Sequence, residues 1–223
     1  MKVSPAKENI LKRIRNALSQ PVPLPFPQSE GNSPVFATPP ENLDVHFAET
    51  FVKLNGKFIF CEDVQVFGKQ FFALCHQQGW KQVLCREKHV REWLAADVHS
   101  HAGPAISLLP SVPPEQMDVA LTGCECLIAR TGSVVLSAGQ AAGRMPSVFA
   151  PVHVVAAFSD QLVWDIRDAL QLIKEKYGDS WPSMCSLHTG PSRTSDIEKT
   201  LVMGAHGPKE MYVFLIDQPL SRQ

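Results

Sequence analysis

The segment near the C-terminal end of the chain combines hydroxyl, glycine and guanidinium groups in a way that suits anion binding. Residues 188–198 read HTGPSRTSDIE. A strand is expected before this segment and a helix after it, so the free amides at the helix start would favour an anion. The guanidinium of Arg193 matches the geometry of a carboxylate or a phosphate. The alternative is an ordinary capped helix in which Arg193 pairs with Asp196 or Glu198.

Three further loops carry similar groups. Residues 129–133 place an arginine, a glycine and two hydroxyls directly after a predicted strand, and residues 204–208 set a histidine between two glycines. Residues 138–146 form a glycine-rich loop that ends near an arginine, and this loop is either a lid or a hairpin connection. The predicted ligand-binding residues are Thr131, Gly132, Ser133, Arg144, Gly190, Ser192, Arg193, Thr194, His206 and Gly207. The candidates for an acid–base group are His206 and Asp196.

The residue spacing gives little indication of a metal site or of a nucleotide-binding site. The pairs His99-x-His101 and Cys124-x-Cys126 have no second pair at zinc-site spacing. The chain contains no Walker motif, no G-x-G-x-x-G after the first strand and no G-x-S-x-G elbow. The sequence therefore predicts no metal and no bound cofactor.

Alternation of helical and strand patterns predicts the elements that position these loops. Residues 4–19 have the period of an amphipathic helix, and residues 20–40 contain seven prolines, which favour an extended arm. This helix would serve association with a second subunit, or else be a loosely ordered tail. Helices are expected over residues 42–55, 63–78, 90–96, 160–177 and near 195–203. Strands are expected over residues 57–61, 81–85, 106–109, 118–121, 126–129, 133–137, 153–158, 184–188 and 211–216.

This order predicts an α/β domain over residues 41–223, preceded by the helix and arm of residues 1–40. Strands that alternate with helices form a mainly parallel sheet, and ligands bind at the carboxyl ends of such strands. The net charge of −1 argues against nucleic acid as a partner. No apolar run is long enough to span a bilayer, no signal peptide is apparent, and several of the six cysteines lie in apolar runs. We therefore expect a cytoplasmic protein with free thiols.

Two motifs in order resemble the lactate-utilisation protein C family, the LUD-domain group. Residues 189–198 resemble the family's T-G-P-S-[RK]-T-x-D-I-E segment, and residues 204–208 resemble its G-x-H-G-P turn. Residues 128–133 and the stretch from Arg144 to His153 resemble two further family segments. The resemblance extends over nearly the whole chain and is specific from about residue 119.

The resemblance implies a three-layer α/β/α sandwich like that of the CoA-transferase and ribose-phosphate-isomerase superfamily. It also implies membership of a bacterial system that oxidises L-lactate to pyruvate, with two partner proteins, at least one of which carries iron–sulfur clusters. One position departs from the family, because Arg130 stands where Glu is usual. A carboxylate in such a loop is the nucleophile of related acyl-transferring enzymes, whereas arginine stays protonated. This departure favours anion binding over covalent acyl transfer.

The sequence analysis thus predicts an accessory component of L-lactate oxidation that binds a small anion, with association into a homo-oligomer through the N-terminal helix as one interpretation. One alternative is a free-standing enzyme of the CoA-transferase-like superfamily that acts on a phosphosugar or a CoA thioester. The other alternative is a non-catalytic scaffold subunit.

Overall fold

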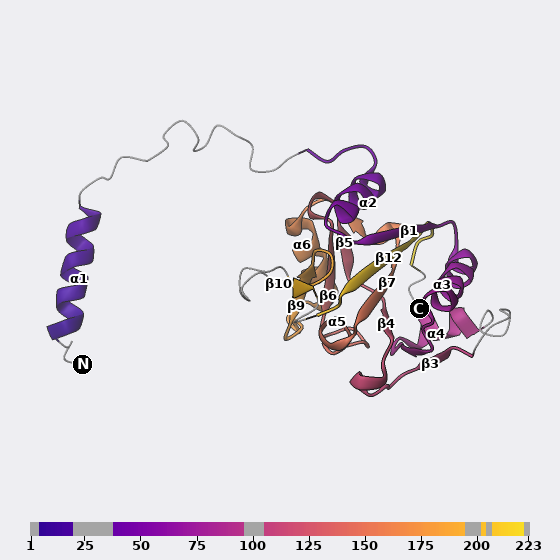
Figure 1. Cartoon of the computed structure of the whole chain (residues 1–223). Helices are drawn as coiled ribbons and strands as arrows, with labels where there is room; N and C mark the ends of the chain where they lie inside the picture. The colour runs from indigo at the N-terminus through magenta and orange to yellow at the C-terminus, as the bar shows by residue number, and fades with distance from the viewer. Residues whose placement is uncertain (1–4, 20–37, 96–104, 195–201, 204–206, 221–223) are drawn as a thin grey trace. The chain divides into compact units, whose positions relative to one another are not determined.

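The computed structural model describes residues 5–19, 38–95, 105–194, 202–203 and 207–220. Internal contacts divide the chain into two units, Met1–Thr38 and Pro39–Gln223. In the first unit, helix α1 (Pro5–Leu18) begins on a proline, which fits the first helical turn. Its apolar residues, including Ile10 and Leu18, are exposed to solvent. The second unit contains the sheets and all the remaining described elements (Figure 1).

A six-stranded sheet forms the centre of the second unit, and all of its described strand pairs are parallel. The order of its strands is β1 (Lys57–Cys61), β12 (Glu210–Ile216), β7 (Val152–Phe158), β4 (Val119–Thr122), β2 (Gln82–Leu84) and β3 (Ser107–Leu109). The central strands β7 and β12 are almost wholly buried, as expected for parallel strands that are covered on both faces. The predicted α/β class with a mainly parallel sheet is confirmed.

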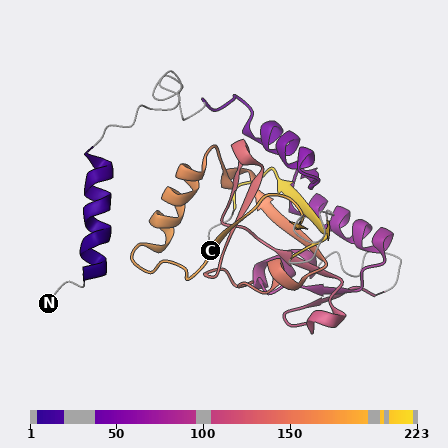
Figure 2. The same cartoon turned by 60° about the vertical axis from the view of Figure 1, so that its left-hand side comes forward.

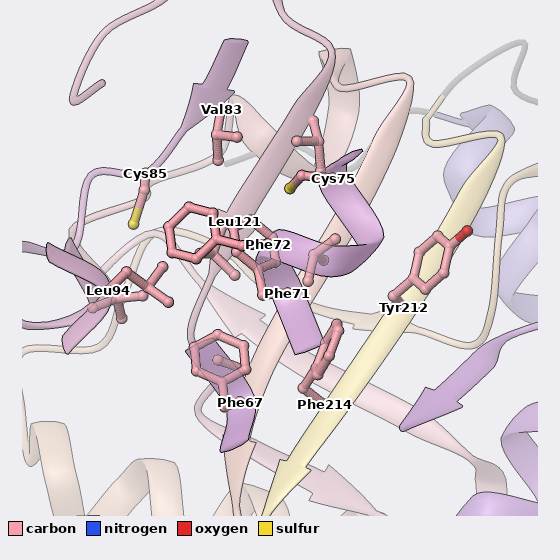
Figure 3. Packing of buried hydrophobic residues seen from close by; sticks show 14 of the residues in the cluster. Phe67, Phe71, Phe72, Cys75, Val83, Cys85, Leu94, Leu121, Tyr212 and Phe214 are labelled. Atoms are coloured by element: carbon pink, nitrogen blue, oxygen red, sulfur yellow. The ribbon is translucent and has the colours of Figure 1, made fainter. Parts of the chain in front are cut away.

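Helices α3 (Val64–Gln78) and α4 (Lys88–Ala95) cover one face of this sheet. Asp63 begins α3 because its carboxylate accepts a hydrogen bond from the amide of Val66 at 2.7 Å, and Gly79 ends it in the left-handed conformation. The aromatic rings of α3 lie against β12, with the Phe67 and Phe214 centroids 5.3 Å apart (Figure 3). Burial of each such ring contributes about 1.5–3 kcal/mol.

The other face is covered by helix α2 (Leu43–Lys53) and by a second, four-stranded sheet. The order of that sheet is β8 (Leu162–Val163), β5 (Cys126–Ile128), β6 (Ser133–Ser137) and β9 (Cys185–His188). Its β5–β8 pair is parallel, and its other two pairs are antiparallel. Helix α6 (Ile166–Tyr177) packs on the second sheet, so α3 and α6 lie on opposite sides of the molecule's strands (Figure 2). The closely spaced apolar runs of residues 126–137 therefore form a layer of their own.

Helix α6 is shorter than predicted. The prediction placed its start at Asp160, but residues Ser159–Gln161 form a 3-10 turn and Leu162–Val163 pair with β5. The helix starts after Asp165, whose backbone amide donates to the carboxylate of Asp168 at 3.0 Å in a capping box. Leu170 of this helix is 46% exposed.

The helix predicted near residues 195–203 is not present where the structure can test it. Residues 195–201 lie outside the described residues. Strand β11 (Val202–Met203) pairs antiparallel with strand β10 (Arg193–Thr194). Thr194 itself is paired in a strand, and the residues that would supply the helix-start amides lie outside the described residues.

The remaining described elements are short. They are the 3-10 helices η1 (Pro114–Gln116) and η2 (Ala129–Thr131) and the one-turn helix α5 (Pro146–Phe149). All six cysteines are free thiols, and five of them are buried. Among the described helices, none has the length and apolar character that crossing a membrane requires.

Candidate functional site

Two of the predicted ligand-binding loops meet through a chain of hydroxyl groups. Ser133 Oγ lies 2.8 Å from Thr131 Oγ1 and 2.9 Å from Thr189 Oγ1. Strands β6 and β9 pair antiparallel with Val134 opposite His188, which brings their ends to the same edge of the second sheet. We call Thr131, Ser133 and Thr189 the hydroxyl cluster.

The glycines beside this cluster allow both loops to pack on the C-terminal half of α2. Gly132 and Gly190 adopt left-handed conformations, with φ of 59° and 84°. A Cβ atom at Gly132 would lie 2.9 Å from the amide nitrogen of Phe51, and one at Gly190 would lie 2.6 Å from the carbonyl oxygen of Leu54. Both positions therefore require glycine for conformation and for space.

The third predicted loop reaches the same region. The amide of Ser192 donates to the carbonyl of Pro208 at 2.9 Å. Gly207 has a φ of 132°, and a Cβ atom there would lie 3.2 Å from Ser192 Cβ and 3.6 Å from the carbonyl oxygen of Ser147. Segments 190–192 and 207–208 and the start of α5 thus meet.

Some predicted site residues are not placed in this group. The side chain of Arg193 is exposed at the start of β10. Thr194 is the second residue of that strand. His206 and Asp196 lie outside the described residues. Their part in the site stays a prediction.

The two loop arginines have partners of their own. Arg144 Nη2 donates to Ser183 Oγ at 2.6 Å in an exposed position. Arg130 Nε lies 2.7 Å from Asp165 Oδ2, and Arg130 Nη2 donates to Asp165 Oδ1 at 3.3 Å. The charge of Arg130 is therefore engaged by the carboxylate that caps α6, and the guanidinium holds the 129–131 turn to the start of that helix.

Two histidines form hydrogen bonds with hydroxyl groups of neighbouring residues. His188 Nε2 lies 2.8 Å from Ser186 Oγ, and the fully buried His153 places its Nε2 2.8 Å from Thr122 Oγ1. Burial, together with the nearby His188, lowers the pKa of His153 to about 3. Burial also lowers the pKa of His188. Sequence reasoning did not assign either imidazole to the site, because a lone histidine in a strand gives no signal of its neighbours.

Two adjoining cavities lie elsewhere, at the carboxyl ends of the central parallel strands. Their volumes are about 410 Å³ and about 220 Å³, and both are lined by Cys124, Gln161, Lys176 and Leu220. We call these adjoining cavities the carboxyl-edge recess. The expectation that ligands bind at carboxyl ends leads to this place, although no residue of the recess was predicted as a site residue. The larger cavity has the size of a small-molecule site.

A buried carboxylate network lies behind the larger cavity. Glu125 Oε2 accepts a hydrogen bond from Lys176 Nζ at 2.7 Å, and its Oε1 accepts from Ser137 Oγ at 2.6 Å and from Tyr177 OH at 2.7 Å. Burial alone would raise the pKa of Glu125, but the hydrogen bonds from Lys176, Ser137 and Tyr177 hold it below its ordinary value. Glu125 is therefore ionised and fully partnered.

No group of three or more histidine, cysteine, aspartate or glutamate side chains suited to a metal ion occurs among the residues that the structure describes. The hydroxyl cluster itself offers three neutral hydroxyl groups. Such groups bind and orient an anion by hydrogen bonding.

Comparisons with known proteins agree on one family. The family model of the LUD domain matches residues 114–216, which include all four predicted loops. A protein of Bacillus licheniformis named Lactate utilization protein C is 35% identical over 107 residues, which cover 47% of this chain and 45% of the relative. A protein of the same name from Geobacillus is 31% identical over 131 residues, which cover 57% of this chain and 54% of the relative. The chain thus spans about half the length of these curated relatives.

A solved structure supports the fold. The crystal structure of a DUF162 family protein from Deinococcus radiodurans aligns with a TM-score of 0.51 at 17% sequence identity. The alignment covers 78% of this chain and 96% of that protein. At this identity the likeness concerns the architecture alone.

Proposed function

Because residues 114–216 match the family model of the LUD domain and the similar proteins include several named Lactate utilization protein C, we propose that this chain is a lactate-utilisation protein C-like component of a bacterial L-lactate oxidation system. In that system L-lactate is oxidised to pyruvate, and this chain binds a small anionic ligand through its glycine-rich loops. The names of its relatives support the first part of the proposal. The geometry of the loops supports the second part.

The observation that carries the ligand proposal is the hydroxyl cluster. It joins the loop of Gly132 to the loop of Gly190 in the part of the chain that the family model matches. Glycines in the left-handed conformation turn backbone amides toward a common point, and such amides favour anions. Arg193 follows in the same segment and supplies a positive charge. A carboxylate or a phosphate group is the ligand that these donors suit.

An accessory role agrees better with these residues than acyl transfer does. A covalent acyl-transfer mechanism requires a nucleophilic carboxylate in the loop. Arg130 occupies the position where the family usually has Glu, and its guanidinium pairs with Asp165. We therefore propose that iron–sulfur-containing partner subunits carry out the electron transfer. The CoA-transferase-like enzyme, with His206 or Asp196 as acid–base group, and the non-catalytic scaffold remain as the competing functions.

A binding experiment tests the ligand proposal. Calorimetry with L-lactate, pyruvate, inorganic phosphate and CoA is expected to give saturable binding for at least one anion. Arg193→Ala is expected to weaken that binding about 10-fold or more, since a charge-assisted hydrogen bond contributes about 1.5–3 kcal/mol. Lys174→Ala, which removes an exposed positive charge from α6, is the matched control. Equal affinity in the protein and in Arg193→Ala would disprove the assignment.

A growth experiment tests the lactate-oxidation proposal. A bacterial strain that lacks the gene is expected to lose growth on L-lactate and to keep growth on pyruvate. Reintroduction of the gene is expected to restore growth on L-lactate. Unimpaired growth of the deletion strain on L-lactate would rule the function out.

A further inference from the structure

The carboxyl-edge recess and the hydroxyl cluster have no residues in common. Its walls come from the ends of β2, β4 and β7, from α4 and α6, and from Gln140 and Ala141 of the 138–146 loop. None of the predicted ligand-binding residues lines it. The two cavities that form it share four lining residues, so they adjoin. The recess therefore has room for a second small ligand.

Negative charge prevails in this recess. Glu87, Glu125, Asp160 and Glu175 line it, whereas Lys176 is the one lysine or arginine among the described lining residues. Lys176 and Glu125 form an ion pair at 2.7 Å and offset each other. Burial lowers the pKa of His89, so this imidazole adds no positive charge at neutral pH. The remaining carboxyl groups disfavour an anionic ligand by like-charge repulsion.

Glu87 is the group that points to a ligand. Its residue is only 4% exposed, and its Oε1 accepts a hydrogen bond from the amide of Gly123 at 3.3 Å. Its Oε2 is buried and has no hydrogen-bond partner among the described residues. Leaving a buried polar atom unpaired costs about 1–3 kcal/mol, so such an atom calls for an explanation.

The two arginines nearest to Glu87 in the chain do not supply the missing partner. Arg91 Nη1 donates to the carbonyl of Cys85 at 2.6 Å, and Arg86 Nη1 donates to the carbonyl of Ala142 at 3.3 Å. Burial raises the pKa of Glu87 despite the hydrogen bond from Gly123 and the charges of these arginines. The Oε2 atom of Glu87 therefore lacks a donor among the described residues.

Aromatic rings form the apolar wall beside Glu87. Trp93 and Phe158 line the smaller cavity, and their ring centroids are 5.3 Å apart with an edge-on arrangement. The ring centroids of His89 and Trp93 are 4.9 Å apart. An indole ring attracts a cation and also packs against hydrocarbon, so this wall suits a ligand that has both.

We propose that the carboxyl-edge recess binds a small organic ammonium ion, with its nitrogen at Glu87 and its hydrocarbon part against Trp93 and Phe158. The ammonium group supplies the donor that Glu87 Oε2 lacks. A bare metal ion is not the expected occupant, because the described residues contain no metal-ligating cluster.

Calorimetry with butylamine, 1-butanol and butyrate on the full-length protein tests the proposal. Butylamine is expected to bind saturably, and the neutral and anionic probes at least 10-fold more weakly. Quenching or shift of Trp93 fluorescence provides an independent readout.

Four variants test whether butylamine binds in the recess at Glu87. Glu87→Gln is expected to weaken butylamine binding at least 10-fold, while Glu115→Gln, an exposed carboxyl outside the recess, leaves it unchanged. Trp93→Leu is expected to weaken binding as well, and it serves as the test if Glu87→Gln does not fold. Arg193→Ala is expected to have no effect, which distinguishes this site from the hydroxyl cluster. Absent butylamine binding, tighter butyrate binding, or unchanged binding in the folded variants would each overturn the proposal.

Discussion

Ser133 Oγ and Thr189 Oγ1 lie 2.9 Å apart although 56 residues separate them in the chain. The antiparallel pairing of β6 with β9 makes this approach possible, because the first residue of β6 and the residue after β9 fall at the same edge. Ser133 is 1% exposed, and its hydroxyl also contacts Thr131. The link therefore couples the two loops that carry most of the predicted ligand-binding residues.

Removal of this link is expected to destabilise both loops. Ser133→Ala leaves two threonine hydroxyls without their shared partner, so it should lower the free energy of unfolding by about 1–2 kcal/mol. Thr189→Val should cost less, since Thr189 is exposed. Urea unfolding of both single variants and of the double variant measures the coupling, and a coupling energy near zero would contradict a direct hydrogen bond.

Arg130→Glu is expected to act on stability more than on ligand affinity. The substitution places a carboxylate beside Asp165, which is 7% exposed and caps α6. Breaking a charge-assisted contact and adding repulsion should lower the free energy of unfolding by about 1.5–3 kcal/mol. Thermal unfolding measures this effect, and a charge-exchanged double variant, Arg130→Glu with Asp165→Arg, should recover part of the loss.

Two glycines in similar left-handed conformations provide a test of close packing. Gly190 has a φ of 84°, and a Cβ atom there would lie 2.6 Å from the Leu54 carbonyl, whereas Gly79, with a φ of 74°, has nothing within 4 Å. Gly79→Ala should therefore cost only the left-handed strain of about 1–2 kcal/mol. Gly190→Ala should cost distinctly more in thermal unfolding, and equal losses would show that α2 can move away from the loop.

The buried His153 predicts a loss of stability in acid. Its pKa is lowered to about 3 by burial and by His188, whereas the ordinary value is 6.5. Below pH 6.5 the unfolded chain binds a proton that the folded chain excludes, so stability falls as the pH falls from 6.5 toward 3. His153→Gln retains a polar partner for Thr122 and has no such titration. Its unfolding free energy, measured between pH 7 and pH 4, should decline less steeply than that of the unmodified protein.

The N-terminal helix is expected to serve association. Its apolar side chains Ile10 and Leu18 are 59% and 80% exposed. A chain that starts at Glu41 should unfold at the same midpoint temperature as the full chain. In light scattering it should form assemblies of lower mass than the full chain does. The full-length double variant Ile10→Asp with Leu18→Asp should show the same decrease in assembly. An unfolded truncation would instead show that residues 1–40 belong to the core.

The sequence by itself determined the elements whose signals are local. Runs of apolar residues predicted β7 and β12. The helix predicted over residues 63–78 was confirmed as α3, because the capping carboxylate of Asp63 and the left-handed Gly79 act on their own neighbours. The motif-bearing loops were likewise visible, since hydroxyl, glycine and arginine spacing is a property of the chain. The α/β class followed from the order of these elements.

Only the tertiary structure decided which of these groups meet. The partner of Arg130 is Asp165, which lies 35 residues away, and nothing in the spacing of either residue indicates the pairing. The two-residue strands β8, β10 and β11 form only where a neighbouring strand offers its backbone. The predicted start of α6 was therefore wrong, and residues 202–203, at the end of the helix predicted near 195–203, form a strand. The role proposed for Glu87 could not be predicted from the sequence either, because its unpaired oxygen results from burial among residues that are distant in the chain. Pairing and burial depend on long-range packing, which local residue patterns do not encode.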